Sequence, residues 1–204
     1  MKFFTKQELF AIFAILLVII LISLANFKVS LRRARDAQRK NDIGAIADGL
    51  NRYANDFAKY PLASPDGKIL ACRPVISEDK NKRKIVEFEP CEWEKDALAD
   101  ALDPTYPSYI KNLPSDPQDD LGVSYLYLSN GARFQIYAVL EGVDEDEYDP
   151  KIVARNLMCG IRICNFGRST GVPLDKSIEE YENELIIENS KFQRQSRLLF
   201  PNAK

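Results

Sequence analysis

One uninterrupted helical pattern at the N-terminus constrains the fold of this chain more than any other feature. The pattern runs from Phe4 to about Phe57, with no proline before Pro61 and only Gly44 and Gly49 to weaken its interior. At about 1.5 Å per residue such a helix is roughly 80 Å long, far beyond the usual helix of a globular domain. It is too long to pack along its whole length on one small domain, so its two halves need different surroundings.

The first half of this helix suits lipid. Leu9 to Phe27 is an apolar run in which the only polar residues are Ser23 and Asn26. Its length of roughly 28 Å matches the hydrocarbon thickness of a bilayer. The run is longer than the apolar region of a secretory signal, and no small-residue cleavage site follows it. We therefore expect residues 4–27 to be a retained transmembrane half-helix.

The second half, residues 28–60, suits a protein core. Its apolar residues recur at alternating spacings of three and four: Ile43, Ile46, Leu50, Tyr53, Phe57 and Tyr60. This spacing places them in a stripe along one helical face. We expect the stripe to cover one face of a sheet.

Residues 61–173 are enough for one globular domain, and their pattern predicts a small antiparallel sheet. Two hairpins are expected, the first from Lys68–Ile76 with Lys84–Phe88. The second joins Tyr125–Ser129 to Ala132–Leu140 through Asn130–Gly131, a dipeptide that predicts a tight type I′ turn. The fold class is therefore α+β, with a long N-terminal helix packed on the sheet.

Three finer expectations apply to the same domain. Arg133 and Gln135 alternate with apolar residues, which predicts one solvent-exposed face for their strand. Glu92–Leu102 reads as a short helix, with Trp93, Leu98 and Leu102 on its buried side. Ile161–Phe166 reads as a further strand that ends at Gly167.

Residues 174–204 depart from the compact domain. A helix capped by Asp175 or Ser177 is expected there. Its apolar residues fall at intervals of seven: Ile178, Leu185, Phe192 and Leu199. Such a stripe indicates either a docking surface or, if nothing covers it, a free charged tail.

Two charged clusters stand out in a chain whose net charge is only −2. The basic cluster, residues 32–40, is read as a solvated helix face with an Asp36–Lys40 pair, as a site for anionic lipid headgroups, or, least favoured, as a nucleic-acid site. The acidic loop Asp144–Asp149 is read as solvated or as a Ca²⁺ site, although its spacing does not match an EF-hand. Histidine is absent and Ser169 and Thr170 have no base to activate them, so we expect no enzyme and no firm cofactor.

The four cysteines predict disulfides. We favour Cys72–Cys91 and Cys159–Cys164, because each pair closes a loop within one local unit. Free thiols and a metal site are the alternatives, and neither pair has the usual C-x-x-C metal spacing. Disulfides require an oxidising compartment, which places the C-terminal domain outside the cytoplasm. The positive-inside rule favours the opposite orientation, but long domains translocate despite flanking charge.

Three segments carry a resemblance to a known family. They are Phe4–Leu9, with a Thr in second and a Glu in fifth place; Ala34–Ile43 followed by Tyr53 and Lys59–Pro61; and Leu113–Pro117 ahead of Tyr125 and Tyr127. In these segments the chain resembles the type IV pilins and the pseudopilins of type II secretion. The resemblance covers about residues 1–140 and implies a pilin-like fold.

The resemblance also implies a processing site and an assembly residue. Residues 1–3 become a candidate leader, with cleavage between Phe3 and Phe4. The new α-amino group of Phe4 would then pair with Glu8 of a neighbouring subunit and set the axial register. Phe3 stands where prepilin peptidases usually require Gly, and Leu17 and Ala25 replace the Gly and Pro at which many pilin helices melt.

The implied function is a structural subunit of a type IV pilus or pseudopilus-like filament. Its partners would be copies of itself, membrane lipid before assembly, and the pilus or secretion assembly machinery. The subunit would be a single-pass membrane protein with an extracytoplasmic domain, and part of a cell-surface pilus when assembled. The alternative is a monomeric membrane-anchored binding or adaptor domain, which Phe3 and the missing Gly and Pro favour.

Overall fold

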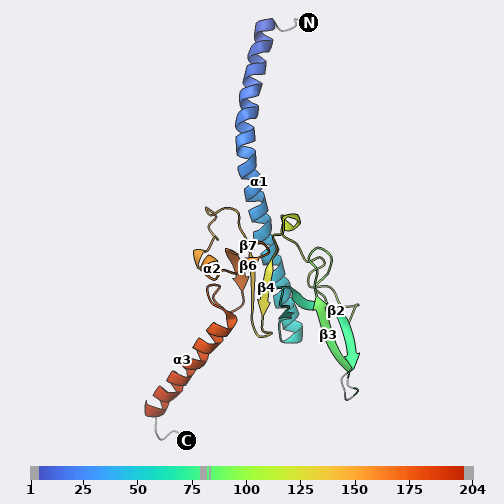
Figure 1. Cartoon of the computed structure of the whole chain (residues 1–204), viewed down its shortest axis with the longest axis vertical. Coiled ribbons are helices and arrows are strands. Elements are labelled where there is room, and N and C mark those ends of the chain that lie inside the picture. Colours follow the sequence, from blue (N-terminus) through green and yellow to red (C-terminus); the bar gives the residue numbers. More distant parts are fainter. Residues whose placement is uncertain (1–4, 79–81, 83, 200–204) are drawn as a thin grey trace.

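The computed structural model describes residues 5–78, 82 and 84–199. One helix, α1 (Lys6–Phe57), leaves the globular domain and extends far beyond it (Figure 1). Thr5 caps its start, and Ala58, in the left-handed conformation at φ 57°, ends it. The expected continuous helix is confirmed. Phe3 and Phe4, the candidate processing site, lie outside the described residues.

The C-terminal half of α1 packs on the domain as its sequence predicted. Ile43, Ile46 and Leu50 are fully buried, Tyr53 nearly so, and Phe57 is partly buried against the same core. This helical face lies against the strands β5 and β8. The chain therefore folds as α+β, with a long helix on a small antiparallel sheet.

In the part of the chain that the structure describes, the strands form three small antiparallel sheets. The first has the order β1-β2-β3 and comprises β1 (Leu62–Ala63), β2 (Ile69–Glu78) and β3 (Lys84–Pro90). The second has the order β4-β5-β8 and comprises β4 (Leu126–Ser129), β5 (Phe134–Ala138) and β8 (Phe166–Ser169). The third pairs β6 (Met158–Cys159) with β7 (Arg162–Ile163). Two short helical turns complete the domain, η1 (Asp119–Leu121) and α2 (Pro150–Ala154).

Both hairpins are present, but the β4–β5 turn differs from the prediction. Ser129 pairs with Phe134, so the connection has four residues rather than two. The Asn130 side chain accepts hydrogen bonds from the backbone N–H groups of Ala132 (3.1 Å) and Arg133 (3.0 Å). A turn closed by the Asn130 side chain therefore forms in place of the predicted type I′ turn.

Strand β5 is buried on both faces, so the predicted exposed face was wrong. Gln135 has no exposed surface, and its amide nitrogen donates to the carbonyls of Pro173 (2.8 Å) and Lys176 (2.7 Å). The segment that leads to α3 therefore covers the outer face of β5. Sequence alternation could not show this cover, because it comes from residues about forty positions away.

Two other element predictions were wrong in part. Glu92–Leu102 forms turns rather than a helix, since the Asp96 carboxylate accepts the Glu92 N–H and Glu94 has a positive φ of 62°. The expected strand Ile161–Phe166 is divided between β7 and β8. Gly167 lies inside β8, where a Cβ would approach the Ile136 carbonyl oxygen to 2.5 Å.

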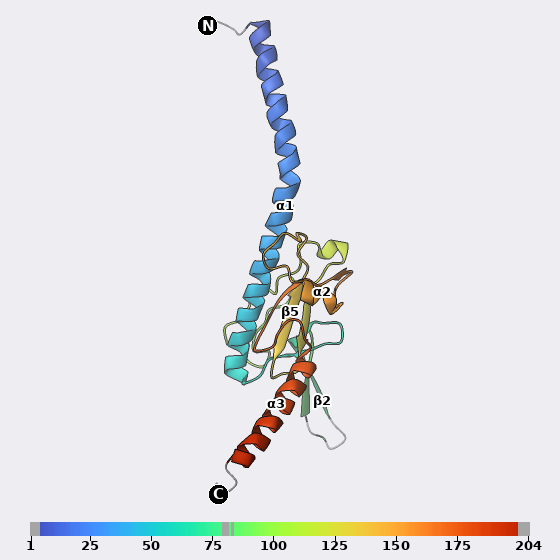
Figure 2. The ribbon, with the colours of Figure 1, turned by 90° about the vertical axis from the view of Figure 1, so that its left-hand side faces the viewer.

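The C-terminal helix is confirmed as α3 (Ile178–Leu199). Ser177 caps it reciprocally: the Ser177 N–H donates to Glu180 Oε2 (2.8 Å), and the Glu180 N–H donates to Ser177 Oγ (3.1 Å). Both views show α3 leaving the domain at the end opposite the N-terminus (Figures 1 and 2). Its first turns contact the domain, whereas Phe192 is 68% exposed. The side chain of Leu199 lies outside the described part of the chain.

Candidate functional site

The N-terminal half of α1 presents apolar side chains to its surroundings on all sides. Its large apolar residues from Leu9 to Leu31 are between about two-fifths and three-quarters exposed. The most apolar 18-residue window has a mean hydropathy of 2.9, and none of it is buried by the rest of the protein. Among the described residues, α1 is the one helix with the length and composition to cross a membrane.

Glu8 is bonded within its own chain at the start of α1. Its Oε2 accepts hydrogen bonds from the Thr5 N–H (2.7 Å) and the Thr5 hydroxyl (2.9 Å). The Glu8 N–H in turn points to Thr5 Oγ1 at 3.4 Å, which completes a capping box. In the single chain Glu8 therefore has a structural partner. Its pairing with a neighbouring subunit stays a prediction.

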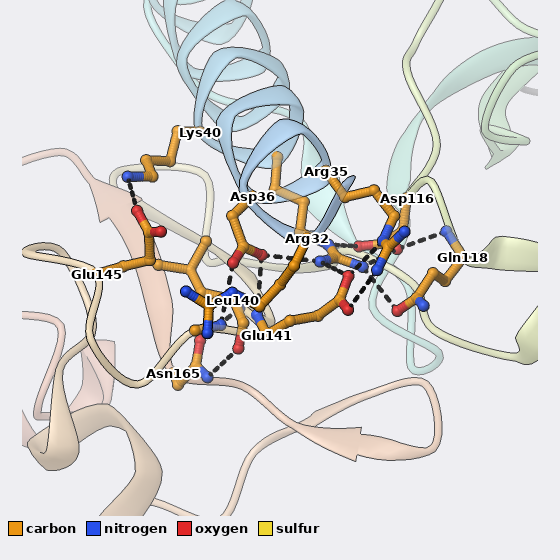
Figure 3. Close-up of polar contacts among 12 residues, drawn as sticks. Arg32, Arg35, Asp36, Lys40, Asp116, Gln118, Leu140, Glu141, Glu145 and Asn165 are labelled. Carbon is orange, nitrogen blue, oxygen red and sulfur yellow. Dashed lines mark hydrogen bonds and ion pairs between the residues drawn. The ribbon is translucent and has the colours of Figure 1, made fainter. Parts of the chain in front are cut away.

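Where α1 enters the domain, a helix–domain ion-pair network joins it to two loops, the one before η1 and the one between β5 and α2 (Figure 3). The helix contributes five residues and the loops contribute six. They are Arg32, Arg35, Asp36, Arg39 and Lys40 from α1, with Asp116, Gln118, Glu141, Asp144, Glu145 and Glu147 from the domain.

Arg39 is the centre of this network and is completely buried. Its guanidinium binds Asp116 in bidentate fashion, with Nε to Oδ2 at 2.7 Å and Nη2 to Oδ1 at 2.9 Å. Nη1 also donates to Asp36 (3.0 Å) and Glu141 (2.9 Å), and Nη2 to Gln118 (3.0 Å). Burial alone would lower the pKa of Arg39, but its bonds to Asp116, Glu141 and Asp36 raise it, so the guanidinium stays charged.

Asp36 links the helix to the backbone that follows β5. Its carboxylate accepts the N–H groups of Glu141 (2.8 Å) and Gly142 (3.0 Å). One residue earlier, the Leu140 N–H donates to Asn165 Oδ1 (2.7 Å), and Asn165 Nδ2 donates to the Leu140 carbonyl (2.8 Å). The part of α1 that enters the domain, the segment that leaves β5 and the segment that leads into β8 are thus fixed to one another.

Three further cations of α1 form ion pairs around this centre. Arg35 binds Glu141 in bidentate fashion at 2.6 and 2.7 Å, and Arg32 Nη2 lies 2.8 Å from Asp144 Oδ1. Lys40 Nζ lies 2.7 Å from carboxylate oxygens of both Glu145 and Glu147. The hydrogen bonds from Arg35, with those from Arg39, lower the pKa of Glu141 to about 2.

The network corrects two sequence interpretations at once. Most of the basic cluster is not a solvated helix face, because all of its cations except the exposed Arg33 bind carboxylates. Lys40 pairs with the acidic loop, and Asp36 pairs with Arg39. The acidic loop is not simply solvated either, because Asp144, Glu145 and Glu147 bind α1. Within the described residues, no three Asp, Glu, Cys or His side chains are grouped to hold a metal ion.

One signal in the sequence anticipated the buried arginine. Arg39 precedes Ile43, Ile46 and Leu50 at spacings of four, three and four, so it lies on the extension of the apolar stripe. A charged residue on a core-facing stripe needs a buried partner. Asp116, which lies in the proline-rich Leu113–Pro117 segment, supplies it.

The cysteines are paired as the sequence analysis favoured. Cys72 is bonded to Cys91, which closes the base of the β2–β3 hairpin, and Cys159 is bonded to Cys164 around the β6–β7 turn. Within the described residues there is no free cysteine. All four cysteines are buried, Cys72 and Cys91 in the main core and Cys159 and Cys164 in a second, smaller buried cluster.

Comparison with known proteins bears on what this arrangement is for. A curated relative aligns over 153 residues, which are 72% of this chain and 88% of the relative, at 27% identity. The chain is distantly similar to type II secretion system core protein G of Vibrio cholerae. No family profile matches the chain, and no solved structure matches it.

The similarity to core protein G supports the resemblance to pilins and pseudopilins, at a distance. The fold has the features that the resemblance implied: a long apolar N-terminal helix, a small antiparallel sheet and a disulfide in the domain. Core protein G is by name a core protein of a type II secretion system.

Proposed function

We propose that this chain is a structural subunit of a type IV pilus or pseudopilus-like filament. The observation that carries the proposal is α1 itself, whose apolar half is exposed while its other half is fixed to the domain. Residues 4–27 would lie in the membrane before assembly and in the filament core afterwards. The distant similarity to core protein G supports this role and a non-enzymatic one.

The physical reason for assembly is that the apolar half-helix needs apolar neighbours in either state. In a bilayer these are lipid chains, and in a filament they are the same half-helices of other copies. Residues 61–173 would form the extracytoplasmic domain, and 174–204 its C-terminal extension. Two disulfides support an extracytoplasmic location, because such bonds persist in oxidising compartments.

Glu8 is the residue that we propose sets the register between subunits. A carboxylate surrounded by apolar side chains costs a few kcal/mol unless it has a partner. Cleavage before Phe4 would create an α-amino group on each copy that could bind the Glu8 of the next. The assembly machinery and lipid are the further partners of this proposal, and nucleic acid is not.

The test compares the amount of filament sheared from cells with the amount of subunit left in the membrane. Glu8→Ala should lower filament yield strongly while leaving membrane insertion intact, and Glu8→Asp should be intermediate. Thr5→Ala is the matched control, because it removes the capping box and keeps the carboxylate. Wild-type yield from Glu8→Ala, or an equal loss in Thr5→Ala, would remove the register role.

The alternative function is a monomeric membrane-anchored adaptor domain. Two observations favour it: Glu8 already has Thr5 as a partner in its own chain, and α1 continues through Leu17 without a break. Mass spectrometry of the native N-terminus separates the two functions. A chain that begins at Phe4 supports the filament subunit, whereas uncleaved monomers in detergent support the adaptor.

A further inference from the structure

The domain begins where the exposed apolar surface of α1 ends. Large apolar side chains of α1 are exposed from Leu9 to Leu31, and Arg32 follows as the first residue of the helix that is bonded to a loop of the domain. From Leu9 to Leu31 the helix rises about 33 Å, close to the hydrocarbon thickness of about 30 Å. Headgroups add about 5–7 Å on each side, so roughly the next four residues of α1 cross the headgroup layer. No spacer separates the domain from that layer.

Three turns make up the end of the domain nearest the apolar half of α1. Both views show η1 and the loop between β5 and α2 at this end (Figures 1 and 2). Asp144 of the β5–α2 loop binds Arg32 at 2.8 Å. The β6–β7 turn adjoins η1, because the Ile161 N–H donates to the Gly122 carbonyl at 2.9 Å. These three turns therefore come closest to a bilayer spanned by α1.

Each of the three turns exposes a large apolar side chain. Val143, Ile161 and Leu121, here called the apolar tips, are 74%, 69% and 56% exposed. Among the described residues outside 9–31, no large apolar side chain is more exposed than Val143. Apolar residues scattered singly over a surface are ordinary, but three on the turns at one end of a domain indicate a contact face.

The exposed charges around the apolar tips are balanced. Six of these residues form no ion pair within the described part of the chain: Lys28, Arg33, Arg162, Asp119, Asp120 and Asp146. Three are cations and three are carboxylates. A strongly anionic surface would attract the first three and repel the others. A zwitterionic phospholipid offers a phosphate to the cations and an ammonium group to the carboxylates, so this balance fits zwitterionic headgroups.

We propose that the apolar tips insert into the headgroup layer of a zwitterionic bilayer and seat the domain on the membrane. Apolar side chains at the boundary between headgroups and acyl chains leave water while their turns stay in place. The inference rests on one part of the proposed function, namely that α1 spans the bilayer. It applies equally to a subunit before assembly and to a monomeric adaptor. Assembly into a filament would then have to lift the domain off the membrane.

The experiment places a tryptophan at one tip of the full-length chain, reconstituted in vesicles of phosphatidylethanolamine and phosphatidylcholine. Trp93→Phe provides the background and Val143→Trp the reporter, whose exposed position lets the larger ring enter without displacing the core. A lipid with a nitroxide on its headgroup quenches a tryptophan that lies in the headgroup layer. If the Val143→Trp chain fails to accumulate, Ile161→Trp provides the same test.

Two reference variants in the same background bracket the result. Leu31→Trp reports on α1 at the membrane boundary. Ile76→Trp is the matched control in water, because Ile76 is 63% exposed on the β2–β3 hairpin at the opposite end of the domain (Figure 1). Quenching at position 143 should be close to that at position 31 and well above that at position 76. Adding anionic phosphatidylglycerol should not increase it.

Three results would overturn this inference alone. Quenching at position 143 no greater than at 76, with position 31 quenched, would show that the domain stands clear of the bilayer. Quenching at 143 that requires phosphatidylglycerol would show that charge, rather than the apolar tips, holds the domain. A blue shift without quenching that grows with the protein-to-lipid ratio would show that a second copy covers the tips. Absence of quenching at position 31 would reject the membrane segment, and with it both the inference and the proposed function.

Discussion

Replacing Arg39 by methionine should destabilise the domain more than any surface substitution. Methionine keeps much of the side-chain volume but removes the charge and every hydrogen bond of the guanidinium. Asp116 then loses both of its short bonds to Arg39, and Asp36 loses one. Asp36 and Asp116 are almost completely buried, so their charges remain in a place that water does not reach.

The magnitude follows from this burial. Removing one partner of a buried ion pair costs about 3–5 kcal/mol, because the remaining charge is uncompensated. Typical domains unfold with about 5–15 kcal/mol, so the loss is a large part of the total. Lys95→Ala is the matched control: it also breaks an i,i+3 ion pair, with Glu92, but the Lys95 side chain is 76% exposed. An exposed pair contributes little to stability, because water and salt screen it.

The assay is urea unfolding of the full-length chain in detergent micelles. Trp93, the single tryptophan, reports on the core through its fluorescence, because its ring lies edge-on to Tyr125 with centroids 5.9 Å apart. Adding Asp116→Asn to Arg39→Met should recover at least about 1 kcal/mol by neutralising the stranded carboxylate. If Arg39→Met cost no more than Lys95→Ala, the reasoning on this network would be refuted.

Three further outcomes are expected. The pKa of Glu141 is lowered from 4.5 to about 2 by Arg35 and its neighbours, so its contribution to stability is complete above the unfolded value and is lost as pH falls through that interval. In the Glu141→Gln variant, the free energy of unfolding should fall less steeply with decreasing pH over this interval than in the unsubstituted chain. An equal fall in both chains would contradict this assignment. Serine at both Cys72 and Cys91 should lower the free energy of unfolding by about 3 kcal/mol through loop-closure entropy, with non-reducing peptide mapping to check the pairing. Residues 28–204 should be soluble without detergent, and a full-length chain that is monomeric without detergent would refute the membrane segment.

The elements with a regular local pattern could be predicted from the sequence. The length of α1 follows from its lack of helix breakers, and its core face follows from the three–four spacing that begins at Ile43. The β2–β3 and β4–β5 hairpins follow from apolar strands around polar turns. These signals are local, so one sequence is sufficient to read them.

What the sequence could not provide is the partner of each charge. Arg39 binds Asp116 and Glu141, which are 77 and 102 residues away, and no local pattern encodes such pairs. The sequence therefore predicts two separate charged surfaces, whereas in the structure the basic and acidic clusters bind each other. The burial of Gln135 was missed for the same reason, since a distant segment covers it.

The helix–domain ion-pair network has a mechanical consequence for the whole molecule. It holds α1 at residues 32–40, and the chain exit at Ala58 holds the other end of the packed half, so the helix and the domain turn as one lever. A tilt of about 20°, common for membrane helices, would displace the far end of an 80 Å lever sideways by roughly 27 Å. The orientation of the domain above the bilayer is thereby set by the tilt of the helix within it.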